Sequence, residues 1–179
     1  MFVAPPEKEV EWTDSGLEGS YRFLARVWRL VEHWAAHLGA SSVEGLGADV
    51  TSAEKAVRRK THDTVRRVTG DIEQRQQLNT AVSAMMELVN DLYAFSEGTK
   101  TGAVRRAEEV PAATDERPQT QAVVREALEA LVRMLSPFAP HTCEELWETL
   151  GHTGGLAEAT WPGYDDAVAK ADEIVVPVQ

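Results

Sequence analysis

Residues 15–39 read SGLEGSYRFLARVWRLVEHWAAHLG and predict a long amphipathic helix. Ser15 and Glu18 have the S-x-x-E spacing of a capping box, in which each side chain satisfies a free backbone N–H of the other residue. Gly39 occupies the position where glycine usually follows a helix C-terminus. Apolar residues recur in steps of three and four, which indicates one buried face, at Leu17, Tyr21, Leu24, Trp28, Val31, Ala35 and Leu38.

Two further helices follow this segment. Thr51 and Glu54 form a second capping box, so we expect a helix to begin there and Gly70 to break or bend it. The next helix carries apolar residues from Leu78 to Phe95 at helical spacing. Residues 98–119 are polar with little apolar periodicity, and we expect a loop there.

The C-terminal third predicts two more helices and one strand. The fourth helix spans about Thr120 to Leu135, and Pro140 suits the first turn of a fifth. Residues 174–178, IVVPV, have the composition of a strand, and a lone strand is not stable without a partner. We therefore predict an all-α, five-helix bundle with a short C-terminal strand whose partners lie outside this sequence.

Composition is that of one globular domain. The chain has 179 residues, 43% of them hydrophobic, and a net charge of −11. Cys143 is the single cysteine, which suits the reducing cytosol, so we expect a cytoplasmic protein. No apolar stretch approaches the roughly 20 residues of a membrane span, and we expect no membrane partner.

Catalytic and metal-binding patterns are absent from the sequence. There is no phosphate-binding glycine loop and no HExxH motif. His33 and His37 have a spacing that could bind a metal ion, but a solvated helix face is the simpler interpretation. Cys143 and His141 fall on different faces of a helix, which favours a structural thiol over a nucleophile. We expect no catalytic, cofactor or metal site.

A row of basic residues on the first helix offers a binding surface. Arg22, Arg26, Arg29 and His33 follow steps of four, three and four, so they share one helical face. The second helix carries a comparable row with flanking cations, formed by Lys55, Arg58, Arg59, Lys60, His62, Arg66 and Arg67. One interpretation is a solvated surface paired with Glu18, Glu32, Glu54 and Asp63. The other is one continuous ridge that contacts an RNA phosphate backbone.

Several blocks of the sequence resemble leucyl-tRNA synthetases, which are class I aminoacyl-tRNA synthetases. They are MFVAPPE at 1–7, EW at 11–12, GLEG at 16–19, RFLARVW at 22–28, RKTH at 59–62, LSPFAPH at 135–141 and EELW at 144–147. The LSPFAPH and EELW blocks are shared with the valyl, isoleucyl and methionyl enzymes, whereas the N-terminal blocks are closer to the leucyl enzyme. The HIGH and KMSKS motifs of the family's catalytic domain are absent.

This resemblance implies the tRNA-binding (anticodon-binding) helical bundle of leucine-tRNA ligase. Residues 1–14 would be the linker from the catalytic domain, 15–160 the bundle, and 161–179 a linker and the start of a C-terminal domain. The parent enzyme would join leucine to tRNA(Leu) using ATP and Mg²⁺, while the fragment would be inactive and hold no cofactor. Its partners would be tRNA(Leu) and the missing catalytic and C-terminal domains.

By matched position, we expect six residues to contact RNA: Arg22, Arg26, Arg29, Arg59, Lys60 and Arg66. Two alternatives remain open at this point. The bundle could belong to a valyl, isoleucyl or methionyl relative, or it could be a structural spacer that barely touches RNA.

Overall fold

The computed structural model describes residues 14–39, 50–96 and 117–170. Within these ranges the regular structure is helical and no strand is present, which agrees with the expected all-α class. The predicted strand at 174–178 lies outside the described residues. The helices are α1 (Asp14–Ala35), α2 (Ser52–Gly70), α3 (Leu78–Ser96), α4 (Pro118–Leu135), α5 (Pro140–Thr149) and the short α6 (Asp166–Ala169).

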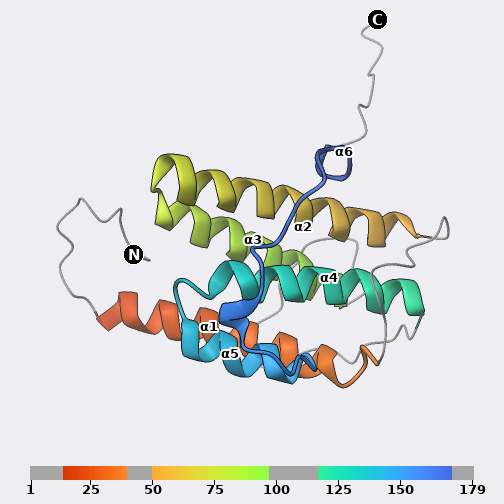
Figure 1. Ribbon diagram of the computed structural model, residues 1–179, viewed down its shortest axis with the longest axis horizontal. Coiled ribbons are helices and arrows are strands. Elements are labelled where there is room, and N and C mark those ends of the chain that lie inside the picture. Colours follow the sequence, from red (N-terminus) through yellow and green to blue (C-terminus); the bar gives the residue numbers. More distant parts are fainter. Residues whose placement is uncertain (1–13, 40–49, 97–116, 171–179) are drawn as a thin grey trace, which may run out of the picture.

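The helices pack in layers around α3 and α4 (Figure 1). Helix α2 contacts α3, α4 and α6, whereas α1 packs mainly against α5 and α3. Helices α1 and α2 therefore lie at opposite edges of the bundle, with α3 between them (Figure 1). None of the helices in the described ranges is long and apolar enough to span a membrane.

The expected starts of α2 and α5 agree with the structure, whereas α1 ends at Ala35, before the expected Gly39. At the start of α2 both capping-box bonds form, with 2.6 Å from the Thr51 N–H to the Glu54 carboxylate and 3.2 Å from the Glu54 N–H to the Thr51 hydroxyl. Gly39 has a φ of +51° after α1, a conformation that favours glycine. The side chain of Ser15 lies outside the described part, so the first capping box stays a prediction. Helix α2 does not end the helical path at Gly70, because a π-helical turn, Asp71–Arg75, follows it directly.

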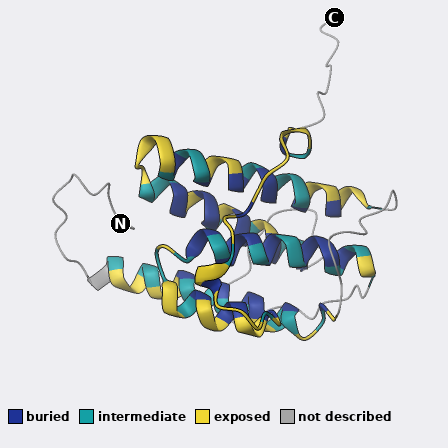
Figure 2. Ribbon diagram, viewed as in Figure 1, coloured by how far each residue is buried: buried dark blue, intermediate teal, exposed yellow. Residues whose placement is uncertain are grey.

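The buried face of α1 differs from the predicted one. The residues that point into the core are Phe23, Val27, Leu30, Val31, Trp34 and Leu38. Of the predicted stripe, Val31 and Leu38 are buried, but Leu17 and Tyr21 are 55% and 71% exposed, and Leu24 and Trp28 are half-buried. Helix α1 is apolar over a broad arc, and packing against α3 and α5 selects the part next to the predicted stripe. Figure 2 shows that buried residues concentrate where the helices face one another.

The segment after α5 returns across the bundle to α2. The indole N–H of Trp161 donates to the Thr69 hydroxyl at 2.8 Å, which anchors this irregular segment to α2. The backbone N–H of Asp165 donates to Nδ1 of His62 at 2.9 Å. Residues 161–170 are thus packed against α2 and not separate from the bundle.

Candidate nucleic-acid interface

The basic row of α1 borders α3 at Arg26, whose side chain contacts Asn90. Arg22 and Glu18 are both well exposed, and their charged groups are 3.3 Å apart. Arg29, two turns along the helix, makes no hydrogen bond or ion pair within the described part of the chain. A surface ion pair of the Arg22 kind contributes little and is easily exchanged for a phosphate. The row therefore keeps available positive charge.

Arg26 lies in the middle of this row and is held by α3. Its Nη2 donates to the amide oxygen of Asn90 at 2.8 Å, and its guanidinium lies 5.0 Å from the ring centroid of Tyr93. The Tyr93 hydroxyl donates to the carbonyl oxygen of Arg26 at 2.9 Å. Nε of Arg26 is buried without a hydrogen-bond partner among the described residues. No carboxylate in those residues neutralises this arginine.

Lys60 lies on the α2 side of α3 and is neutralised. Its ammonium group is 2.8 Å from the Glu87 carboxylate and 3.9 Å from that of Asp91. Arg67 contacts the same Glu87 carboxylate at 2.9 Å. The hydrogen bond from Lys60, against the opposing effect of burial and with help from Arg67, lowers the pKa of Glu87. Glu87 stays charged beside these two cations and weakens their attraction for phosphate.

Arg59 and Arg66 lie on a different side of α2 from Lys60. Arg66 pairs with Asp63, and the hydrogen bond and charge of Asp63 raise the pKa of Arg66, with a smaller contribution from Asp166 in the C-terminal segment. Arg59 is half-buried and has no ion pair within the described ranges. Asp166 of α6 contributes to the pKa of Arg66, so α6, which packs against α2, lies close to this arginine.

The prediction that the basic residues of α1 and α2 form one continuous ridge is therefore wrong. The structure brings Arg22, Arg26 and Arg29 together on α1, but Arg59 and Arg66 belong to the opposite edge of the bundle. Lys60 is the predicted α2 residue that approaches α3, and it meets carboxylates there. The basic residues thus form two separate surfaces, and within the described residues Arg26 and Arg29 on α1 and Arg59 on α2 have no carboxylate partner.

His62, a member of the predicted α2 row, is buried and has a structural role. Its Nε2 lies 3.1 Å from the Glu126 carboxylate, which Arg58 also contacts at 2.8 Å. Because Nδ1 accepts from the Asp165 N–H, the proton of the neutral ring is on Nε2. Burial alone would raise the pKa of Glu126, but the hydrogen bonds from His62 and Arg58 outweigh it and lower this pKa. His62 and Arg58 thus tie α2 to α4 and to the C-terminal segment.

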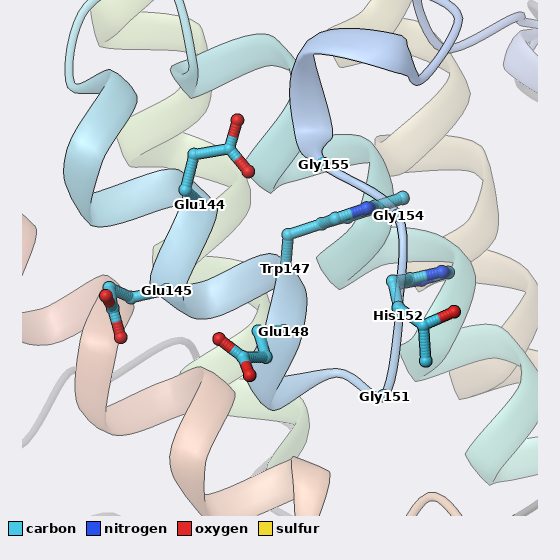
Figure 3. A pocket seen from close by; sticks show the side chains of 9 residues that line it. Glu144, Glu145, Trp147, Glu148, Gly151, His152, Gly154 and Gly155 are labelled. Carbon is cyan, nitrogen blue, oxygen red and sulfur yellow. The ribbon is translucent and has the colours of Figure 1, made fainter.

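A shallow, acidic pocket of about 560 Å³ lies between α5 and the segment that follows it. Figure 3 shows that Glu144, Glu145 and Glu148 point in different directions around it, so their carboxylates do not converge on one point. The Glu144 carboxylate accepts the Leu156 N–H at 2.8 Å, which gives it a structural role. The pocket has neither the charge for a phosphate nor the convergence for a metal ion.

The histidine and cysteine candidates give no catalytic arrangement. The rings of His33 and His37 are 5.1 Å apart, and burial, with a smaller contribution from His37, lowers the pKa of His33. Burial, assisted by the charge of Glu144, raises the pKa of the Cys143 thiol to about 12. A thiol with this pKa stays protonated near neutral pH and is a poor nucleophile. Within the described residues no group of three His, Cys, Asp or Glu side chains could hold a metal ion.

Comparison with known proteins identifies the family. The profile described as the anticodon-binding domain of tRNA ligase matches residues 54–177. The chain belongs to this family. A leucine-tRNA ligase from a Geobacter species is 44% identical over the whole chain, and that of Chromohalobacter salexigens is also 44% identical. The valyl, isoleucyl and methionyl alternatives are not favoured by these relatives.

A solved structure of the same kind agrees with the fold. It is a LeuRS of Agrobacterium radiobacter in a ternary complex with tRNA and LeuAMS, with a TM-score of 0.69 and 30% identity. It covers 90% of this chain, and this chain covers 18% of it. The two leucine-tRNA ligases above are covered to 20% and 19% of their lengths. The chain is thus an anticodon-binding domain that spans about a fifth of its curated relatives.

Sequence reasoning missed the α3 residues that shape the interface. Asn90, Tyr93 and Glu87 were not expected there, although Asn90, together with Asp91, interrupts the apolar residues between Val89 and Leu92. This interruption was the available signal, since a half-buried amide needs a hydrogen-bond partner. Which partner it meets depends on how α1 packs against α3, and the periodicity of one helix does not contain that information.

Proposed function

We propose that this anticodon-binding domain docks the body of a leucine tRNA through the basic row of α1. Arg22, Arg26 and Arg29 would contact the phosphate backbone, and Arg59, Lys60 and Arg66 would contribute from the separate α2 surface. The observation that carries the proposal is the α1 row, where two of three arginines have no carboxylate partner in the described residues. Backbone contacts of this kind position RNA without reading its sequence.

The comparisons support tRNA as the partner. The Agrobacterium radiobacter LeuRS was solved together with tRNA, and the relatives are named as leucine-tRNA ligases. The parent enzyme would attach leucine to tRNA(Leu) with ATP and Mg²⁺ in the cytoplasm. Catalysis, ATP and Mg²⁺ would belong to other domains of the same polypeptide, because the sequence of this chain has no HIGH or KMSKS motif.

Binding of a leucine tRNA transcript to the chain tests this proposal. Fluorescence anisotropy should give an affinity that the double variant R22A/R26A weakens by roughly tenfold or more, because two charge-assisted contacts are lost. The charge-matched control is R75A/K170A, which removes two cations outside the α1 row and should cost much less. Equal losses in the two double variants would contradict the proposal and favour a structural spacer.

A further inference from the structure

Arg26 is held differently from the other basic residues around α3. Lys60 and Arg67 form ion pairs with the carboxylate of Glu87, and Arg22 forms an ion pair with Glu18. The partner of Arg26 is instead the amide oxygen of Asn90, which carries no charge. An amide fixes the direction of a guanidinium and leaves its positive charge intact, whereas a carboxylate cancels that charge.

Two residues of α3 hold this arginine in place. Asn90 accepts from Nη2 at 2.8 Å, and the ring of Tyr93 lies 5.0 Å from the guanidinium carbon. The Tyr93 hydroxyl also bonds to the main-chain oxygen of Arg26 at 2.9 Å, so side chain and backbone are both tied to α3. A free arginine side chain loses conformational entropy when it binds a ligand, and one that is already held loses less.

Holding Arg26 against α3 has an energetic cost that packing alone does not explain. Nε of Arg26 is buried and has no acceptor in the described part of the chain. A buried donor without a partner is unfavourable, and an apolar side chain of similar length would avoid it. The Asn90 side chain makes no other hydrogen bond within the described residues, so its amide serves this one contact. A charge held without neutralisation at such a cost indicates a binding role.

We propose that Asn90 and Tyr93 are positioning residues that hold the Arg26 guanidinium, with its charge intact, against one phosphate of bound RNA. This inference rests on the proposed function, because it assigns a task within the same site. Asn90 and Tyr93 act through Arg26 and need not touch the RNA. The α1–α3 contact is then part of the RNA-binding surface and not only of the core.

The variant N90D separates positioning from packing. An aspartate at this place keeps an acceptor for Arg26 and forms an ion pair, so the melting temperature should be kept or raised. The new carboxylate cancels the arginine charge and repels phosphate, so affinity for a leucine tRNA transcript should fall roughly tenfold, about as far as in R26A. N90A should lie between wild type and R26A, and N90Q, which retains an amide oxygen, should recover part of the loss.

Asn79 provides the matched control. It is also a half-buried asparagine of α3, but its side-chain oxygen is buried without a partner and does not contact Arg26. N79A should therefore leave tRNA affinity unchanged. Y93F keeps the ring against the guanidinium and removes the bond to the Arg26 carbonyl, so its effect should be smaller than that of N90D.

The outcomes separate the two levels of the proposal. If R26A weakens tRNA binding and N90D binds as well as wild type, the positioning role is overturned while the docking proposal stands. If R26A itself binds tRNA like wild type, both RNA docking through Arg26 and the positioning role of Asn90 and Tyr93 are overturned. Loss of affinity in N90D with an unchanged or raised melting temperature supports the inference, because a purely structural role predicts that affinity follows stability.

Discussion

Glu54 is almost fully buried at the start of α2, and it makes four polar contacts there. Its carboxylate accepts hydrogen bonds from the Thr51 N–H and, at 2.6 Å, from the Thr120 hydroxyl. The Arg117 guanidinium lies 3.7 Å from the same carboxylate, and the Glu54 N–H donates to the Thr51 side chain. Burial by itself would raise the pKa of Glu54, but the hydrogen bonds from Thr120 and Thr51 and the charge of Arg117 outweigh it. The net result is a lowered pKa, so the folded state favours the charged carboxylate.

Replacing Glu54 by glutamine should reduce both stability and its pH dependence. Near neutral pH we expect E54Q to lose about 2 kcal/mol in urea unfolding, since hydrogen bonds to a charged group are lost. Because the pKa of Glu54 is lowered in the folded state, its charged carboxylate contributes fully to stability above its unfolded-state pKa of about 4.3. This contribution is lost as the pH falls through the folded-state pKa. The loss of wild-type stability on acidification should therefore be smaller in E54Q. An unchanged pH profile would contradict this account, and E18Q, at an exposed pair, is the control.

Thr64 is fully buried, and its hydroxyl has no partner in the described residues. The substitution T64V removes an unsatisfied polar group and keeps the shape of the side chain, so we expect a gain of about 1 kcal/mol in the free energy of unfolding. Thr61 is the control, because it is also buried but its hydroxyl donates to the Val57 carbonyl at 3.0 Å. T61V should give no gain, and a destabilised T64V would show that the hydroxyl is satisfied in solution.

At the scale of elements, His62 links three parts of the chain. It lies on α2, contacts Glu126 of α4 and accepts the N–H of Asp165 just before α6. Nδ1 must carry no hydrogen for this contact, because it accepts the hydrogen bond from the Asp165 N–H. Trp161 adds a second attachment through Thr69. The C-terminal segment is therefore fastened to α2 at two points.

Removing the His62 imidazole should break one of these two attachments, the hydrogen bond from the Asp165 N–H. In H62A we expect the amide of Asp165 to exchange its hydrogen faster, because its acceptor is gone, while amides in the middle of α3 keep their protection. The measurement is hydrogen exchange by NMR, with H141A as a control at an exposed histidine of α5. Unchanged exchange at Asp165 would mean that another group holds the segment.

The sequence predicted the elements better than the faces they bury. Capping boxes, prolines and glycines act locally, so the start of α2, the start of α5 and the turn at Gly39 could be located in advance. The buried face of α1 could not, because Leu17 and Tyr21 share their helix with a second apolar stripe that includes Phe23 and Val27. Which stripe is buried depends on the neighbouring helices, and these are distant in sequence.

At the scale of the whole molecule, the arrangement of helices decides which cations can act together. Arg22, Arg26 and Arg29 were predictable as a row, because steps of three and four place residues on one helical face. Their separation from Arg59 and Arg66 was not, because no local pattern indicates that α3 lies between α1 and α2. The net charge does not decide this either: the chain carries −11 overall, yet two arginines of α1 remain without carboxylate partners in the described residues.

The salt dependence of tRNA binding tests the central claim, that the α1 row contacts phosphates, most directly. Each phosphate contact releases counterions, so the slope of log Kobs against log salt reports how many contacts form. The triple variant R22A/R26A/R29A should reduce the magnitude of this slope by about three relative to wild type. R75A/K170A, which removes two cations elsewhere, should leave the slope nearly unchanged. A triple variant with the wild-type slope would contradict docking through α1.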